Sequence, residues 1–338
     1  MRLIVVTQQV DPASPVLGAT VAKLRALAER VDELVVLADS AVADALPGNC
    51  RVRLFRSGTR AGRGLRFERA LGRELLRRPR PAAVLAHMCP IYAVLAAPVA
   101  RPLGVPVLLW FTHWRKSRLL ATAERLSTRV LSVDRRTFPL ESKKVVAIGH
   151  GIDVADLPCV ERPERDPLTL LALGRTSPAK GLVTIVHAVA RVPDVKLLIV
   201  GPSLTEEERL HKIALERLVI ELSLLDRVDV RHAVPRHTVP GLFGEVDALV
   251  NDMRAGATDK VVYEAAATCM PVLASNPAFD TLLPPELRFA HGDVEGLADA
   301  IGGLVHADRN AIGRGLRAVV VREHSVEAWA QRVVDLSG

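Results

Sequence analysis

Short apolar runs alternate with longer amphipathic segments along most of the 338-residue chain. The short runs predict buried strands, and apolar residues at helical spacing predict helices between them. Strands are predicted near residues 2–7, 33–37, 51–54, 82–86, 106–110, 129–132, 144–148, 169–173, 195–200, 228–231, 246–250 and 271–274. Helices are predicted near residues 18–31, 62–78, 90–101, 181–192, 204–223, 238–244 and 259–269, with two or three more in the tail. This alternation favours an α/β fold with doubly wound parallel sheets over a sandwich or a barrel.

The length of the chain favours two domains, because it is about twice that of a typical one. Three prolines and alternating charges mark a linker at residues 156–167. We therefore predict a first domain at residues 1–155 and a second at 168–322. Hydrophobic residues make up 49% of the chain and aromatics only 4%, so the core consists mainly of Leu, Val and Ala, as in strands covered by helices on both sides.

The segment 171–181, LALGRTSPAKG, predicts a phosphate site. A buried strand ends at Gly174, a turn follows with Arg175 and Lys180, and a helix begins near Gly181. A diphosphate at this turn would meet backbone N–H groups, the positive end of the helix and two cations. The alternative interpretation is a solvated strand-to-helix loop that holds one Arg and one Lys.

A second segment, 246–275, has the pattern of a strand, a glycine loop, a helix and another strand. Glu264 lies midway along this helix among apolar and small residues. Because the carboxyl ends of parallel strands share one edge of a sheet, this loop and the turn at 174–181 are expected to face the same crevice.

Together, GRTSPAKG and the Glu264 helix resemble the nucleotide-sugar site of the retaining glycosyltransferases of family 4. MRLIVVTQQVDPASPVLGATVAKL at the start, VVAIGHGID at 145–153 and KLLIVGP at 196–202 are similar to other elements of that family. The resemblance implies the GT-B fold, in which two Rossmann-like domains face a central cleft. It also implies that Arg175 and Lys180 bind the donor diphosphate and that Glu264 binds the donor. The last helix, at 323–338, is expected to pack back on the first domain.

One position departs from the family pattern. The first acid of the usual pair would lie eight residues before Glu264, where this chain has Gly256. The loop instead reads G-x-x-D-K, which resembles a subgroup variant. Lys260 is then expected to add a third cation for the diphosphate, and Gly256 to admit it by backbone approach.

The first domain is expected to hold the acceptor. His87 and His113 each follow a predicted strand, so their side chains are expected at the sheet edge where the strands end and ligands bind. The alternative for each is a structural histidine. The resemblance assigns His113 to the reacting end of the donor, and Gly18 to a loop that approaches the donor phosphate. Thr20 beside it is an alternative hydroxyl contact or a helix cap. Lys116, near His113, favours an anionic acceptor.

Eleven arginines lie between Arg51 and Arg80, opposed by two glutamates, and the net charge of the chain is +7. Leu65, Ala70, Leu71, Leu75 and Leu76 predict an amphipathic helix with a cationic face there. That face is either a solvated surface or a peripheral contact with an anionic membrane. Nucleic acid is not expected as a partner, because aromatic residues do not alternate with the cations and no binding module is present.

The four cysteines have no metal-ligand spacing, and a reduced intracellular chain explains them best. The ten histidines form no metal motif, so neither a metal nor a cofactor is expected. The N-terminal residues enter a strand without the pattern of a secretory signal. We therefore expect a cytoplasmic protein, or one at the inner face of a membrane.

The resulting prediction is a metal-independent, retaining glycosyltransferase that transfers a sugar from a nucleoside-diphosphate sugar to a glycan, lipid or small-molecule acceptor. Two alternatives remain open. One is a non-catalytic, glycosyltransferase-like subunit that binds a nucleotide sugar, which the glycine at position 256 favours. The other is a nucleotide-sugar epimerase of the same fold. A Rossmann dehydrogenase is disfavoured, since no G-x-G-x-x-G follows the first strand.

Overall fold

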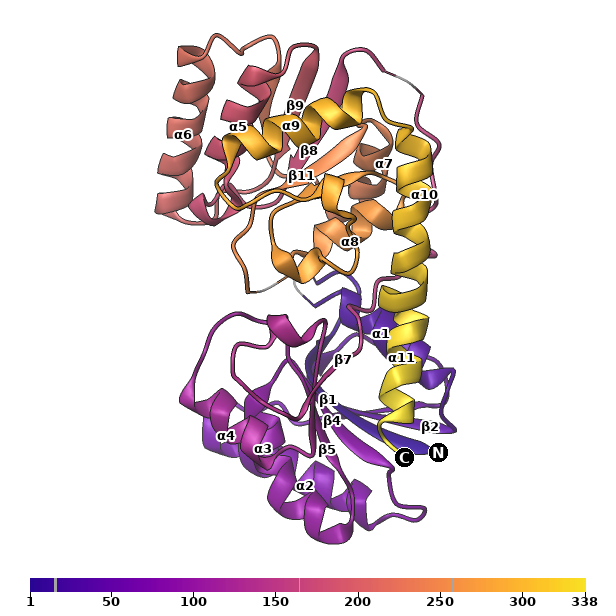
Figure 1. Ribbon diagram of the computed structural model, residues 1–338. Helices are drawn as coiled ribbons and strands as arrows, with labels where there is room; N and C mark the ends of the chain where they lie inside the picture. Colours follow the sequence, from indigo (N-terminus) through magenta and orange to yellow (C-terminus); the bar gives the residue numbers. More distant parts are fainter. Residues whose placement is uncertain (15–16, 164, 257) are drawn as a thin grey trace. The chain divides into compact units, whose positions relative to one another are not determined.

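The computed structural model describes residues 1–14, 17–163, 165–256 and 258–338 (Figure 1). It divides into two compact units. Unit 1 comprises Met1–Asp153 and Glu323–Gly338, and unit 2 comprises Val154–Arg322. Each unit is built on a sheet of parallel strands, so the predicted α/β class is confirmed.

The sheet of unit 1 has the strand order β3-β2-β1-β4-β5-β6-β7. Its strands are β1 (Arg2–Val10), β2 (Glu33–Ala41), β3 (Cys50–Leu54), β4 (Ala83–His87), β5 (Val107–Trp110), β6 (Arg129–Ser132) and β7 (Val145–Ala147). Its α-helices are α1 (Ala19–Ala28), α2 (Arg60–Leu76), α3 (Pro90–Ala100), α4 (Arg118–Leu126) and α11 (Val326–Asp335).

Alternate residues of these strands face two different helix layers, as the period of two along a strand requires. Ile4, Val84 and Leu109 belong to the core that α2, α3 and α4 cover. Within that core Phe67 lies 4.8 Å from Tyr92, measured between ring centroids. Both faces of the sheet are thus buried, which explains why its strands are nearly continuous apolar runs.

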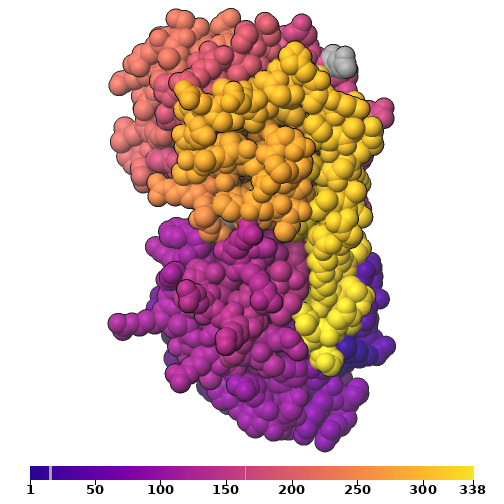
Figure 2. All heavy atoms as spheres, viewed as in Figure 1, coloured from indigo at the N-terminus to yellow at the C-terminus, as the bar shows by residue number. Residues whose placement is uncertain are grey.

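The last helix of the chain completes unit 1. Helix α11 packs beside α1 (Figure 1), and in Figure 2 the yellow C-terminal residues lie against the indigo N-terminal ones. Trp329 of α11 meets Trp110 of β5 edge to face, with ring centroids 5.5 Å apart. The ammonium group of the buried Lys23 lies 4.9 Å from the Trp110 ring and 5.3 Å from the Trp329 ring. A cation between two aromatic rings contributes on the order of 1 kcal/mol or more.

The buried face of α2 differs from the prediction. Phe67, Leu71 and Leu75 are buried, whereas Leu65 and Leu76 are 59% and 75% exposed. At 100° per residue, Leu65 and Leu76 lie nearly opposite Phe67, so these two leucines share the outer side of the helix with its arginines. Thr59 caps the helix by accepting a hydrogen bond from the Gly62 N–H.

The sheet of unit 2 has the strand order β10-β9-β8-β11-β12. Its strands are β8 (Leu168–Leu173), β9 (Val195–Val200), β10 (Val228–Arg231), β11 (Ala248–Asn251) and β12 (Val272–Ala274). Its α-helices are α5 (Leu182–Arg191), α6 (Glu206–Glu221), α7 (Val239–Gly244), α8 (Lys260–Ala267), α9 (Val294–Val305) and α10 (Arg309–Val319).

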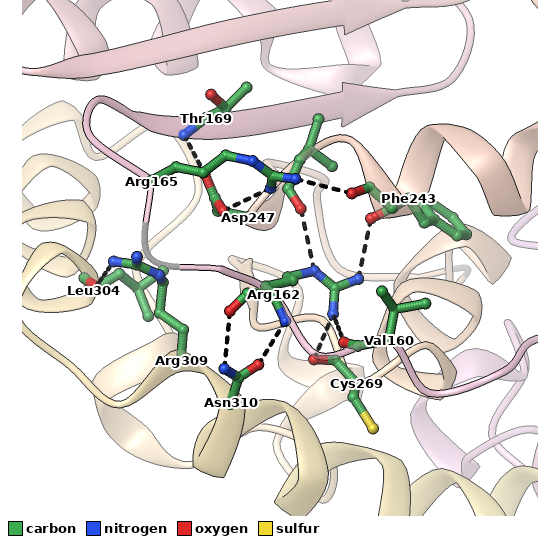
Figure 3. A network of polar contacts seen from close by, with 12 residues as sticks. Val160, Arg162, Arg165, Thr169, Phe243, Asp247, Cys269, Leu304, Arg309 and Asn310 are labelled. Carbon is green, nitrogen blue, oxygen red and sulfur yellow. Dashed lines mark hydrogen bonds and ion pairs between the residues drawn. The ribbon is translucent and has the colours of Figure 1, made fainter.

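The segment 156–167, predicted as a linker, lies within unit 2 in the structure. Arg162, only 4% exposed, donates hydrogen bonds to several backbone carbonyls of unit 2 (Figure 3). Arg165 forms an ion pair with the fully buried Asp247 at 2.9 Å, and Asp247 also accepts a hydrogen bond from the Thr169 N–H. Two cations of this segment, Arg162 and Arg165, therefore make internal contacts, whereas its acids Asp156, Glu161 and Asp166 are exposed.

Two of the four cysteines form a disulfide, so the prediction of a fully reduced chain is wrong. Cys159 and Cys269 are bonded, with Cα atoms 5.0 Å apart and positions 110 residues apart in sequence. Cys50 and Cys89 are free thiols. Disulfides persist mainly in oxidising compartments, so the cysteines no longer support the predicted reducing environment.

Across the described parts of the chain, no helix has both the length and the apolar character needed to span a membrane.

Candidate functional site

The turn after β8 and the end of β9 pack tightly at one edge of the unit 2 sheet. Open parallel sheets bind ligands at the carboxyl ends of their strands, which share that edge. Gly174 follows β8 with a φ of +146°, a conformation that favours glycine. A Cβ atom added to Gly201, just after β9, would lie 1.6 Å from the Gly174 carbonyl oxygen. The contact between these two backbones fixes the direction in which Arg175 leaves the strand.

Lys180 is held between the end of β11 and the start of α8. It ends a short 3-10 turn, after which Gly181, with a φ of +56°, leads into α5. Its Nζ forms an ion pair with Asp259 Oδ2, and the same oxygen accepts a 2.9 Å hydrogen bond from Asn251 Nδ2. The Lys180 and Asp259 side chains are 16% and 18% exposed, so the ammonium group has a defined position at the ligand edge.

Arg175 lies at the same edge but is more exposed. Its Nη1 is 3.2 Å from Glu208 Oε1, and 56% of the Arg175 side chain is exposed. Glu208 is buried and also accepts a 2.7 Å hydrogen bond from the Leu204 N–H. Ion pairs between exposed side chains contribute only about 0–1 kcal/mol to folding, and water reaches this pair from the Arg175 side. The guanidinium of Arg175 can therefore exchange Glu208 for an external anion at little cost in stability.

Glu264 lies buried in α8 between two cations. One of its carboxylate oxygens, Oε1, is 2.6 Å from Lys260 Nζ, one turn earlier on the helix, and also forms an ion pair with Arg236. Burial alone would raise the pKa of Glu264, but Lys260 and Arg236 outweigh it and hold the pKa below its usual value. Glu264 is therefore an ionised hydrogen-bond acceptor at neutral pH.

The loop before α8 contains the position where the family pattern has its first acid. Gly256 has a φ of +133° and is partly buried. Residue 257 lies outside the described residues. The nearest following acid, Asp259, is engaged by Lys180, and Lys260 is engaged by Glu264. The structure thus brings the motif residues of the two segments together through the Lys180–Asp259 contact.

Several polar residues of this edge were not predicted. Arg236, on the 3-10 turn Arg236–Thr238, reaches Glu264 from 28 positions away in sequence. Asp252 follows β11, is fully buried, and lies 2.7 Å from His291 Nδ1. A Cβ atom at Gly181 would lie 2.2 Å from Asp252 Oδ2, so this carboxylate abuts the start of α5. Its place directly after a buried strand was the sequence signal that could have identified Asp252.

In unit 1, His87 ends β4 and is 5% exposed. Neither ring nitrogen has a hydrogen-bond partner among the described residues. Burial, and secondarily the charge of Lys23, lower the pKa of His87 from 6.5 to about 3. The ring is therefore neutral and enclosed, as in the structural interpretation of this residue.

We expect the neutral, buried His87 to make folding sensitive to acid. Because the folded pKa lies below the unfolded one, stability is complete above pH 6.5 and is lost as the pH falls toward 3. At pH 5 the loss from this residue is about 2 kcal/mol. Denaturant unfolding at pH 7 and pH 5 should show wild type losing about 2 kcal/mol more than His87→Leu. Equal losses in the two proteins would contradict a buried neutral ring.

His113 and Lys116 lie in the exposed segment between β5 and α4. His113 Nδ1 accepts a 3.0 Å hydrogen bond from the Arg115 N–H, and its ring stacks on Trp114 with centroids 5.6 Å apart. Trp114 is itself 62% exposed. This segment presents aromatic rings and cations to solvent at the carboxyl end of β5.

Gly18 occupies the N-cap position of α1, where a Cβ atom would lie 2.7 Å from the carbonyl oxygens of Pro12 and Ser14. The approach of these two carbonyl oxygens leaves no room for a side chain at position 18, so the fold alone accounts for the glycine. Thr20 is buried in the first turn of α1.

An open pocket lies at the carboxyl end of β2, beside the start of α2. Its lining contains Arg56, Arg63 and Arg66 with Asp39 and two serines. Arg63 Nε is 3.4 Å from Asp39 Oδ1, while Arg66 donates to the Arg56 carbonyl oxygen at 2.6 Å. Three arginines facing one carboxylate give this pocket a positive character that suits an anionic group.

No group of three or more His, Cys, Asp or Glu side chains that could hold a metal ion occurs in the described part of the chain.

Residues 158–280 match the family model described as glycosyl transferases group 1. Phosphatidyl-myo-inositol mannosyltransferase from Mycolicibacterium smegmatis is 32% identical over 187 residues, which cover 51% of this chain and 46% of that protein. The aligned part of the chain thus spans about half the length of the relative it matches.

Solved structures of other proteins are similar in fold to this chain over nearly its whole length. HepE from Anabaena in complex with UDP has a TM-score of 0.77 at 16% identity, covering 99% of each chain. Sucrose-phosphate synthase from Thermosynechococcus elongatus has a TM-score of 0.73 at 18% identity, covering 99% of this chain and 98% of the other. A glycosyltransferase from Rickettsia africae has a TM-score of 0.76 at 14% identity, covering 99% and 97%. The protein therefore has the GT-B fold, and residues 158–280 of its second unit are similar to the glycosyl transferases group 1.

Proposed function

We propose that the protein is a retaining, metal-independent glycosyltransferase that uses a nucleoside-diphosphate sugar. The observation that carries this proposal is the Lys180–Asp259 ion pair, which joins the turn after β8 to the start of α8, where Lys260 contacts the buried, ionised Glu264 one helical turn later. Arg175 belongs to the same turn and pairs with Glu208. Cations suit the two phosphates and a carboxylate suits the ribose hydroxyls. The match to glycosyl transferases group 1 covers all of these residues.

In this proposal Arg175 and Lys180 stabilise the charge that grows on the departing diphosphate, the largest electrostatic change in the transition state. Glu264 accepts hydrogen bonds from the ribose. Since Gly256 replaces the first acid, no enzymic nucleophile is assigned. The acceptor attacks from the face that the diphosphate leaves, and a diphosphate oxygen takes the acceptor proton. This route retains the configuration of the sugar.

In this proposal unit 1 binds the acceptor substrate. Arg56, Arg63 and Arg66 around the pocket, and the exposed Lys116, favour an acceptor that carries phosphate, such as a lipid-linked glycan. The outer side of α2, with its arginines and two exposed leucines, favours peripheral contact with an anionic membrane surface. The mannosyltransferase relative acts on a phosphatidylinositol, as its name states.

A thermal-shift screen against UDP, GDP, ADP, dTDP and their sugars tests the proposal. The correct nucleotide should stabilise the protein by a few kcal/mol at saturation. Free nucleoside diphosphate should then appear from the nucleotide sugar only when an acceptor is added, and EDTA should leave that rate unchanged. Absence of stabilisation by every nucleotide would refute the proposal, and loss of activity in EDTA that magnesium restores would refute metal independence.

A second candidate is a non-catalytic protein that binds a nucleotide sugar, which Gly256 in place of an acid favours. Stabilisation by a nucleotide without turnover across a panel of acceptors would support that candidate.

A further inference from the structure

Helix α8 carries Lys260 and Glu264 but has only eight residues, a length of about 12 Å. A helix this short contributes little stability of its own, so its position depends on the contacts at its ends. At its N-terminal end lies Asp259, which binds Lys180. The other end of α8, at residues 267–269, is held by a separate set of contacts.

Arg162 is the central contact at that end (Figure 3). Its Nη1 donates to the carbonyl oxygens of Thr268 at 3.0 Å and Cys269 at 2.8 Å, and Nη2 donates to Thr268 Oγ1 at 3.3 Å. The same guanidinium donates to the carbonyl oxygens of Val246 and Phe243, each at 3.1 Å. Arg162 therefore joins the end of α8 to the segment that leads into β11.

The chemistry of this contact requires an arginine. The guanidinium is buried, and in the described part of the chain it contacts carbonyl and hydroxyl oxygens rather than a carboxylate. Burial lowers the pKa of Arg162 to about 10, Asp247 opposes that shift and Arg165 adds to it. The negative end of the α8 dipole favours a cation here. A lysine has a single nitrogen and could not reach carbonyls of three segments at once.

Other contacts hold the same end without Arg162. Arg317 of α10 donates to the Ala267 carbonyl oxygen, and a Cβ atom at Gly313 would lie 1.8 Å from the Cys269 carbonyl oxygen. The disulfide joins Cys269 to Cys159. A variant that lacks the Arg162 guanidinium therefore keeps the Arg317 hydrogen bond, the close packing at Gly313 and the disulfide, and it is expected to fold.

We propose that Arg162 is a positioning residue for the nucleotide site, because it holds residues 268–269 and so sets where Glu264 lies relative to Arg236 and the turn after β8. The inference rests on the proposed function for the role of Glu264 itself. Arg162 touches no ligand in this proposal and acts only through α8.

The test compares Arg162→Met and Arg162→Lys with Arg2→Met. Arg2 is a matched control, since it is buried in unit 1 and donates to the Glu74 and Arg77 carbonyl oxygens at the end of α2. UDP, GDP, ADP and dTDP are titrated calorimetrically into each protein. We expect Arg162→Met to raise the Kd of the preferred nucleotide at least about 10-fold, Arg162→Lys to have an intermediate effect, and Arg2→Met to leave the Kd unchanged.

A double variant separates positioning from general destabilisation. Because both residues act through one contact, adding Arg162→Met to Glu264→Gln should weaken binding less than about twofold further. The KM for the donor should rise by a larger factor than kcat falls. The proposal would be overturned if the losses of nucleotide affinity in Arg162→Met and Glu264→Gln added in full in the double variant. It would also be overturned if the Kd of Arg162→Met stayed within twofold of wild type.

Hydrogen exchange gives a readout that needs no ligand. Peptides covering residues 260–267 should exchange faster in Arg162→Met than in wild type, and not in Arg2→Met, at equal distance below each Tm. If wild type bound none of the four nucleotides, the proposed function would fail while the exchange result still decided the role of Arg162. Unchanged exchange in α8 would refute that role.

Discussion

Replacing Arg175 by alanine is expected to lower kcat/KM for sugar transfer by about 100-fold or more, because a cation that meets growing phosphate charge acts mainly in the transition state. Stability should change little, since the Arg175 side chain is 56% exposed and its ion pair with Glu208 has one solvated partner. Steady-state kinetics and thermal unfolding of the same preparation measure both effects.

Arg209→Ala is the matched control for Arg175. The Arg209 side chain is 57% exposed, as much as that of Arg175, and pairs on the same helix with Glu206, which is itself 70% exposed. Its removal therefore deletes one exposed arginine and one ion pair outside the proposed phosphate site. Transfer by Arg209→Ala should equal that of wild type. If Arg175→Ala kept more than about a tenth of the activity, or if both variants lost it equally, the phosphate role of Arg175 would be wrong.

Replacing Glu264 by glutamine is expected to weaken nucleotide binding at least about 10-fold, because hydrogen bonds to a charged group are worth about 1.5–3 kcal/mol. Glu264→Ala, which also removes the side-chain volume, should lower transfer by about 100-fold or more. The low pKa of Glu264 means that these losses should be the same at pH 6 and pH 8. Calorimetric titration with the preferred nucleoside diphosphate gives the Kd.

Glu74→Gln provides the control for a buried glutamate between cations. Glu74 is 1% exposed in α2 and pairs with Arg2 and Arg77. Its replacement should lower stability while leaving nucleotide affinity unchanged. An equal loss of affinity in Glu74→Gln and Glu264→Gln would show that the effect of Glu264 is general destabilisation, contrary to the proposed ribose contact.

The sheets were the most predictable part of the structure. All of the predicted strands are present, because strands covered on both faces are apolar runs that need no tertiary information to recognise. Helix α4 was not predicted from the sequence. It has only nine residues and follows a cationic segment, and its start is marked by Ser117, which accepts a hydrogen bond from the Leu120 N–H. The exposed position of Leu65 does not follow from its apolar side chain, because its angle on the helix, nearly opposite Phe67, directs it to the outer side of α2.

The turn at 174–181 and the Glu264 helix could be located from sequence, because glycine and cations follow a strand there. Their partners could not. Arg236 and Arg162 reach α8 from distant segments, and nothing in their own neighbourhoods distinguishes them from surface arginines. The Cys159–Cys269 bond has the same origin, since only the fold brings together positions 110 residues apart. Sequence patterns report local periodicity, whereas these contacts depend on how the elements pack.

The return of the last helix to unit 1 has a consequence for biosynthesis. Trp110 and its neighbours on one sheet face are covered by Trp329, which the ribosome adds only after all of Val154–Arg322. At about 5–20 residues per second, the first-made domain waits on the order of 10 s with that apolar face open. The nascent chain is therefore most prone to aggregation, and most in need of a chaperone, while its second domain is still being translated.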